Sequence, residues 1–147
     1  MSSFIIPHRS STPENMRIAS RTGVYGIARQ NDQILFVKQE RGPHSGKFDL
    51  PGGGIEAGET IEEALRREFI EEVGMTFDSM LLVDNFTANT DAVDGNGTPY
   101  ILHQIGLVYS VSGLSPSQNH QAEMEYYWLD AKEIATVDLA PFAKRIR

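Results

Sequence analysis

Three glutamates in one short segment are the residues best suited to chemistry. Glu68, Glu71 and Glu72 have a spacing that places side chains on one face of an α-helix. The apolar residues that precede them on the same face are Ile61, Ala64 and Leu65. A stripe that should face the core therefore continues as carboxylates, which, if unpaired there, would cost several kcal/mol each or take up protons. A divalent cation resolves this conflict, because Mg²⁺ binds carboxylate oxygens and often completes its coordination shell with substrate phosphate.

The helix that must position these glutamates is expected over residues 61–73. Thr60 is a suitable N-cap, and Glu63 completes a capping box with it. Gly74 suits the left-handed residue that commonly ends a helix, and no Pro or Gly interrupts the segment between. The alternative is a glutamate-rich helix with a merely solvated surface. The position of the glutamates on the stripe that should be buried argues against that alternative.

The segment from Gly53 to Met75 resembles the signature of the Nudix hydrolases, G-x5-E-x7-R-E-U-x-E-E-x-G-U, where U is apolar. Every fixed position is met, by Gly53, Glu59, Arg67, Glu68, Phe69, Glu71, Glu72, Gly74 and Met75. The resemblance implies a MutT-like enzyme that hydrolyses the pyrophosphate bond of a nucleoside diphosphate linked to another group, X. It also implies Mg²⁺ or Mn²⁺ as cofactor and a small nucleotide or nucleoside diphosphate derivative as substrate.

The resemblance also implies roles for single residues of the box. Glu68 and Glu72 are the first expected metal ligands and Glu71 the third, and either Glu71 or Glu68 serves as the general base. The carbonyl of Gly52 is a further candidate ligand, since a glycine-rich loop lets the backbone approach an ion closely.

Four other positions of the box have expected roles. Arg67, on a different helix face from the acidic stripe, and Glu59 are expected to hold the loop and helix together, and a catalytic role for Arg67 is the alternative. Gly53 and Gly74 are expected to serve the structure of the motif.

Candidates outside the box are less specific. A further metal ligand is expected beyond the box, with Glu123 the first candidate and Glu125 the second, although both can equally be ordinary surface acids. The basic residues Lys38, Arg41 and Lys47 are candidate phosphate contacts, with solvated side chains as the alternative. The aromatic residues that could stack a base are Tyr25, Phe48 and Phe86, but isolated aromatics are more often part of a core.

Composition excludes several classes of function. The net charge is −7, with 20 acidic against 13 basic residues, which argues against a nucleic-acid partner because such binding needs a basic surface. The chain has no Cys, so disulfides, thiolate metal sites and a cysteine nucleophile are excluded. No apolar run approaches the roughly 18 residues that a membrane span needs, and a cytoplasmic protein with no membrane partner is expected.

The remaining segments predict an α+β domain. Residues 1–16 are read as an irregular lead-in and residues 17–147 as a single domain. In the lead-in, the apolar patch Phe4-Ile5-Ile6 can dock either on the core or on a partner subunit of a homodimer. Strands are expected at residues 17–29, 33–39, 48–50, 77–90, 100–111 and 125–129, and helices after Asp130 and over 139–146. The resemblance sharpens this to a Nudix-type α/β/α sandwich with a mixed β-sheet.

The identity of X is predicted only by elimination. The proline that ADP-ribose members carry beyond the box is missing, since Thr90, Asp91 and Ala92 occupy that region. The patterns of coenzyme A and dinucleoside polyphosphate members are also absent, which leaves a (d)NTP or similar small nucleotide. Two alternatives are a non-catalytic nucleotide-sensing module and an isoprenoid diphosphate isomerase of the same fold. A complete carboxylate set disfavours the first alternative, and the lack of Cys disfavours the second.

Overall fold

The structure is a computed structural model that describes residues 16–42 and 44–146. Its elements in chain order are β1 (Arg17–Gln30), β2 (Gln33–Lys38), β3 (Phe48–Asp49), β4 (Gly52–Gly54), α1 (Ile61–Val73), β5 (Met75–Thr76), β6 (Ser79–Val93), β7 (Pro99–Ser112), β8 (Ser115–Pro116), β9 (Tyr126–Leu129), α2 (Ala131–Ile134) and the 3₁₀-helix η1 (Ala143–Ile146). A seven-stranded sheet follows the path β3-β2-β1-β7-β6, with β4 paired to β1 and β9 to β2. β5 and β8 form a separate pair.

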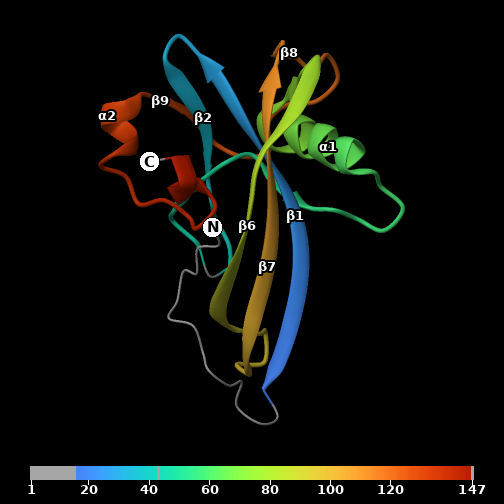
Figure 1. Cartoon of the computed structure of the whole chain (residues 1–147), viewed down its shortest axis with the longest axis vertical. Helices are drawn as coiled ribbons and strands as arrows, with labels where there is room; N and C mark the ends of the chain where they lie inside the picture. The colour runs from blue at the N-terminus through green and yellow to red at the C-terminus, as the bar shows by residue number, and fades with distance from the viewer. Residues whose placement is uncertain (1–15, 43, 147) are drawn as a thin grey trace.

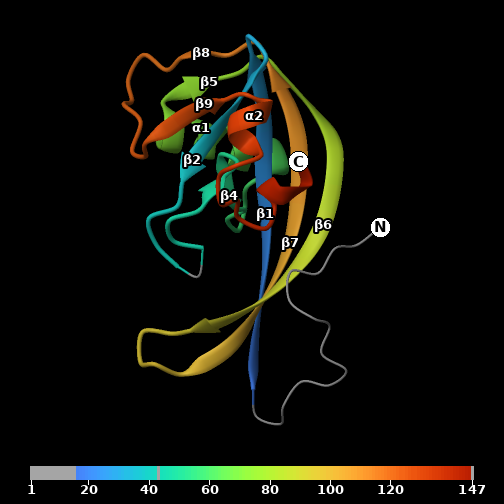
Figure 2. The same ribbon diagram turned by 90° about the vertical axis from the view of Figure 1, so that its left-hand side faces the viewer.

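The sheet is mixed, because β1 is parallel to β7 while β6 is antiparallel to β7. These three long strands run the length of the molecule (Figure 1). Helix α1 covers one side of their upper half, and α2 and η1 lie on the other side. The lower half projects beyond the helices, as Figure 2 also shows. The predicted α+β architecture, a mixed sheet between helices, is confirmed.

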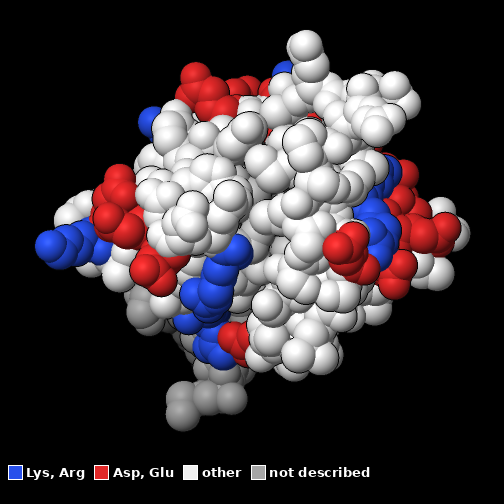
Figure 3. Space-filling view, turned by 90° about the horizontal axis from the view of Figure 1, so that it is seen from above, with Lys and Arg blue, Asp and Glu red and all other residues white. Residues whose placement is uncertain are grey.

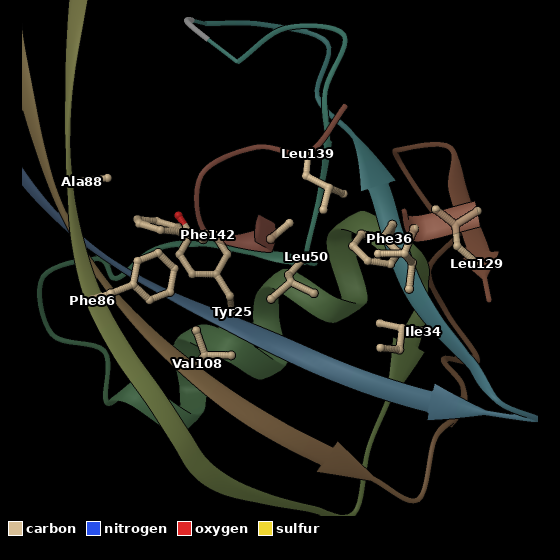
Figure 4. Close-up of a cluster of buried hydrophobic side chains, with 12 residues drawn as sticks. Tyr25, Ile34, Phe36, Leu50, Phe86, Ala88, Val108, Leu129, Leu139 and Phe142 are labelled. Carbon is tan, nitrogen blue, oxygen red and sulfur yellow. The ribbon is translucent and has the colours of Figure 1, made fainter. Parts of the chain in front are cut away.

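Successive side chains of β1 point to opposite faces of the sheet, and a hydrophobic core lies on each face. Val24 is fully buried against α1, in a cluster that includes Leu65 and Phe69. Its neighbour Tyr25 points to the opposite face and packs against Phe142, with ring centroids 4.7 Å apart. Figure 4 shows this second cluster, which the C-terminal segment closes.

Helix α1 begins and ends where the sequence predicts. Thr60 accepts a hydrogen bond from the backbone of Glu63, whose side chain bonds back to Thr60, and Gly74 adopts a φ of 66°. Ala64 and Leu65 of the predicted apolar stripe are fully buried, but the stripe differs at two other positions. Ile61 is 38% exposed, whereas Phe69 is fully buried. The reason is that Gly26 of β1 leaves room for the Phe69 ring: a Cβ at Gly26 would lie 2.6 Å from it.

Other predicted boundaries shift where pairing extends the strands. Residues 52–54, predicted as a loop, form β4 and pair with residues 23–25 of β1. β6 and β7 extend into the predicted loop at 91–99, leaving a turn at 94–98. The predicted C-terminal helix is only the short 3₁₀-helix η1. In the described residues no helix is long and apolar enough to cross a membrane. The lead-in and its Phe4-Ile5-Ile6 patch lie outside the described residues, except for residue 16.

Candidate active site

Strand β4 and helix α1 form one unit, because glycines let the helix side chains lie against the strand. The backbone N–H of Gly52 donates to Glu72 Oε1 over 3.0 Å. A Cβ at Gly53 would lie 2.5 Å from Glu68 Oε1. Gly52 has a φ of 148°, and a side chain there would collide with the carbonyl of Val24. Only a glycine strand therefore brings both carboxylates this close to the sheet.

Arg67 joins the loop, the helix and two of the three glutamates. Its guanidinium donates to both carboxylate oxygens of Glu59, at 2.7 and 2.9 Å, and to the carbonyl of Gly54 at 3.1 Å. It also contacts Glu68 Oε1 at 3.1 Å and Glu71 Oε2 at 3.3 Å. The prediction that Arg67 lies apart from the acidic stripe is wrong, because its long side chain reaches back across the helix. The hydrogen bonds from Arg67 lower the pKa of Glu59.

Glu68 and Glu72, which lie beside the hydrogen bonds of Arg67 and Gly52, are half-buried. Burial raises the pKa of Glu68, which the charge of Arg67 and, more weakly, that of Arg21 oppose. Burial also raises the pKa of Glu72 to about 8, with the Gly52 N–H opposing the shift and Glu68 and Asp49 adding to it. Burial and the neighbouring carboxylates thus together favour the protonated form of Glu72. Figure 3 shows red and blue side chains gathered on the right, where Figure 1 places α1.

These carboxylates open into a cavity of about 220 Å³ between β4, β1 and the segment that follows β2. The lining residues are Arg21, Tyr25, Gln39, Arg41, Gly42, His44, Asp49, Gly52, Gly53, Glu68, Glu72, Leu102, Gln104, Pro141 and Phe142. A larger cavity of about 920 Å³ lies between the β1–β2 hairpin, β6 and the C-terminal segment. It contains none of the three glutamates of α1, so we place the candidate site in the smaller cavity.

The structure brings some predicted residues to this cavity and leaves others outside it. Glu68, Glu72, Gly52, Gly53 and Arg41 line it, whereas Glu71, Lys38 and Lys47 are not among its described lining residues. The ammonium group of Lys38 instead lies over the ring of Phe48, 5.7 Å from its centroid. Of the three aromatic candidates, Tyr25 alone lines the cavity, and Tyr25 and Phe86 both belong to the core.

Glu123 approaches the helix through its backbone rather than its side chain. Its N–H donates to the carbonyl of Glu71 over 2.9 Å, and the next residue, Met124, donates to that of Glu72 over 3.1 Å. The Glu123 side chain is 60% exposed and lies 3.4 Å from His120 Nε2. Glu125 accepts a hydrogen bond from the Tyr127 hydroxyl, at 2.5 Å. Neither carboxylate is among the described residues that line the cavity.

Several lining residues were not predicted as part of the site. Asp49 is almost fully buried, and Arg21, His44 and Gln104 come from three separate segments. Arg21 and Gln104 are direct partners in the parallel β1–β7 ladder. No local sequence pattern signals such a pair, because parallel strands are joined by a long connection.

A family model described as "NUDIX domain" matches residues 18–147 of this chain. The chain belongs to the Nudix hydrolase family. As a member of it, this Nudix hydrolase is an enzyme that acts on nucleoside diphosphate derivatives.

Curated relatives and solved structures agree with this assignment. The Nudix hydrolase is 32% identical over 127 residues to a nucleoside triphosphatase NudI of Enterobacter sp. (strain 638), covering 81% of this chain and 88% of the relative. It is 39% identical over 71 residues to an ADP-ribose pyrophosphatase of Methanocaldococcus jannaschii, covering 48% of this chain and only 42% of that protein. A MutT Nudix hydrolase from Burkholderia pseudomallei has the same fold, with a TM-score of 0.64 at 24% identity, covering 86% of this chain and 95% of the other.

Nudix hydrolases generally use divalent metals, and the donor set of this site suits such an ion. Glu68 and Glu72 supply hard oxygen ligands, and their crowding with Asp49 raises the pKa of Glu72 further beyond the effect of burial. A bound cation would offset that excess of negative charge. Within residues 16–42 and 44–146, however, no three acidic or imidazole side chains already converge as a cation site. Arg67 instead bonds one oxygen of Glu68 and one of Glu71, and the Gly52 N–H bonds one oxygen of Glu72.

Proposed function

We propose that this Nudix hydrolase cleaves a nucleoside triphosphate or a similar small nucleotide at its pyrophosphate bond. The observation that carries the proposal is the pair of half-buried carboxylates, Glu68 and Glu72, that face a cavity of about 220 Å³. The nucleoside triphosphatase relative, which aligns over most of both chains, supports this substrate class. The ADP-ribose pyrophosphatase relative aligns over less than half of each chain.

In the proposed reaction, a water oxygen forms a bond to phosphorus while the bridging phosphorus–oxygen bond breaks. One proton of the water passes to a carboxylate, and the leaving phosphate takes the electron pair of the broken bond. Glu68 and Glu72 would hold Mg²⁺ or Mn²⁺ with the carbonyl of Gly52, and such an ion neutralises phosphate charge and acidifies bound water. Glu71 or Glu68 accepts the proton, and Arg67 positions both of them through the contacts described above.

The substitution Glu72→Gln tests this proposal. The amide keeps the size of the side chain and an oxygen that accepts from the Gly52 N–H, but it removes the negative charge. We expect kcat for nucleotide hydrolysis with Mg²⁺ to fall by about two orders of magnitude or more. The melting temperature without metal should not fall, because the buried carboxyl is replaced by a neutral group.

Thermal melts with chelator and then with excess Mg²⁺ provide a second readout. Metal should raise the melting temperature of the wild type more than that of Glu72→Gln, because the ion binds the folded site. Near-normal turnover in the variant, or equal metal-induced shifts in both proteins, would contradict the metal assignment. Tight nucleotide binding by the wild type without turnover across a broad nucleotide and metal panel would contradict hydrolysis itself.

A further inference from the structure

Arg21 of β1 lies beside the carboxylate pocket although it is outside the Nudix box. It lines the same cavity as Glu68 and Glu72. Its guanidinium extends over Gly54 of β4, where a Cβ would lie 2.9 Å from Arg21 Nε and 3.0 Å from Nη2. The absence of a side chain at position 54 is therefore what lets the guanidinium reach across the strand.

Alternation along β1 keeps the space beside Arg21 open. Arg21, Gly23 and Tyr25 point to the same face of the strand, and a Cβ at Gly23 would lie 2.8 Å from the Tyr25 hydroxyl. No side chain thus separates Arg21 from Tyr25. The next strand places the buried amide of Gln104 directly beside Arg21, through the parallel register of β1 and β7.

The donors of Arg21 are available, in contrast to those of Arg67. The guanidinium of Arg67 donates hydrogen bonds to Glu59, Glu68, Glu71 and the carbonyl of Gly54. In the part of the chain that the structure describes, no hydrogen bond or ion pair involves the guanidinium of Arg21. The ion pair of Glu68 Oε1 is with Arg67, at 3.1 Å. An arginine fork without a protein partner, beside a cavity, suits the oxygens of a phosphate group.

We propose that Arg21 binds a phosphate group of the nucleotide substrate in the cavity that it lines with Glu68 and Glu72. This inference rests on the proposed function and deepens it by naming a substrate-binding residue outside the family signature. Arg41, which lines the same cavity, is the only other arginine among the described lining residues. With a net charge of −7, the chain needs such local cations to hold a polyanion near its own carboxylates.

The substitution Arg21→Gln tests the assignment, with Arg29→Gln as the matched control. Arg29 is on the same strand, but it lines the larger cavity instead. With Mg²⁺ present, titration calorimetry measures the Kd of an α,β-methylene nucleoside triphosphate and of inorganic pyrophosphate. Arg21→Gln should weaken both about ten- to a hundredfold, as expected when charge-assisted hydrogen bonds are lost. Arg21→Lys should recover part of the loss, and Arg29→Gln should match the wild type.

Gly54→Ala supplies a second variant that acts through position alone. Its methyl group should displace the Arg21 side chain, so Gly54→Ala alone should bind the nucleotide analogue more weakly than the wild type does. The double variant Gly54→Ala/Arg21→Gln should bind the analogue no more weakly than Arg21→Gln alone. Circular dichroism and melting temperature would show that all variants fold. A purely structural role for Arg21 would lower the melting temperature and leave the Kd values of the folded protein unchanged.

The outcomes separate this inference from the proposed function. If the wild type binds the analogue but cleaves no nucleotide, the proposed hydrolysis fails, while the Kd values still decide the role of Arg21. If the wild type cleaves nucleotides and Arg21→Gln binds both probes as tightly as the wild type does, only the inference about Arg21 fails. Weaker binding of the nucleotide analogue with unchanged pyrophosphate binding would place Arg21 on the nucleoside, and failure of the wild type to bind either probe would also overturn the assignment.

Discussion

Arg67 pairs with Glu68 and Arg21 lines the same cavity as Glu68, and the partners of each arginine determine what it can do. Arg67 is held by four acceptor groups, so its charge serves to fix the orientations of Glu59, Glu68 and Glu71. Arg21 is exposed and has no such partners among the described residues. The two arginines thus have different roles, because the hydrogen-bond donors of Arg67 bond other groups of the protein whereas those of Arg21 remain for a ligand.

Asp49 is the most deeply buried acid of the cavity, at 5% exposure. Burial raises its pKa to about 7, although the Gln39 amide and the Leu50 N–H both donate to its carboxylate. An unfolded aspartate has a pKa of about 3.9. Between these two values the folded protein binds the extra proton, so this contribution to the free energy of unfolding is complete below about pH 4 and is lost as the pH rises through 7.

We therefore predict that Asp49→Asn removes one component of the pH dependence of stability. In a metal-free buffer with chelator, the melting temperature of the wild type should fall relative to that of Asp49→Asn as the pH rises from about 5 to 8. Scanning calorimetry across this range measures the difference. Parallel curves for the two proteins would show that Asp49 is not protonated in the folded state.

At the scale of elements, the unit formed by β4 and α1 positions the carboxylates. The helix is fixed at its start by the capping box of Thr60 and Glu63. Near its end, backbone N–H groups of residues 123 and 124 bond the carbonyls of Glu71 and Glu72. The C-terminal end of the helix is thereby tied to a separate part of the chain, which limits rotation of Glu71 and Glu72 away from β4.

Thr60→Ala should lower the free energy of unfolding by about 1 kcal/mol, because it removes the acceptor for the Glu63 N–H. Thr60→Ser retains a hydroxyl and should cost markedly less. Urea unfolding followed by circular dichroism compares the two variants at equal protein concentration. If they are equally destabilised, the cap does not contribute through its hydroxyl, and loss of the threonine methyl group would account for the effect instead.

At the scale of the whole molecule, the helices cover only the upper half of the long sheet (Figures 1 and 2). Two apolar side chains of the lower half, Ile18 and Val93, are 52% and 64% exposed. The lower half of β1 pairs with β7 along one edge, whereas residues 23–25 also pair with β4 on the other. Strand β4, against which Glu68 and Glu72 lie, is at the better-supported end of the sheet.

This asymmetry predicts a gradient of local stability along a single strand. Amides of residues 17–21 should exchange with deuterium faster than those of residues 24–28, although both segments pair with β7. Hydrogen exchange read by NMR measures this directly, with residues 24–28 as the internal reference. Equal protection along β1 would show that the projecting half is as stable as the covered half.

The sequence alone determined the parts of this protein that depend on local patterns. The capping residues predicted the bounds of α1, and the Nudix box predicted the family. Both features are set by residues close together in the sequence, through helix caps and the spacing of side chains on one face.

Only the tertiary structure decided what depends on long-range pairing. Gly52–Gly54 pair with β1, and this pairing brings the glycines against Glu68 and Glu72. Three glycines have no side-chain pattern from which a strand could be predicted. Phe69 rather than Ile61 faces the core, because the space left by Gly26 lies on another strand. Arg21 reaches the site for the same reason: strand register, not sequence distance, decides which side chains meet across a sheet.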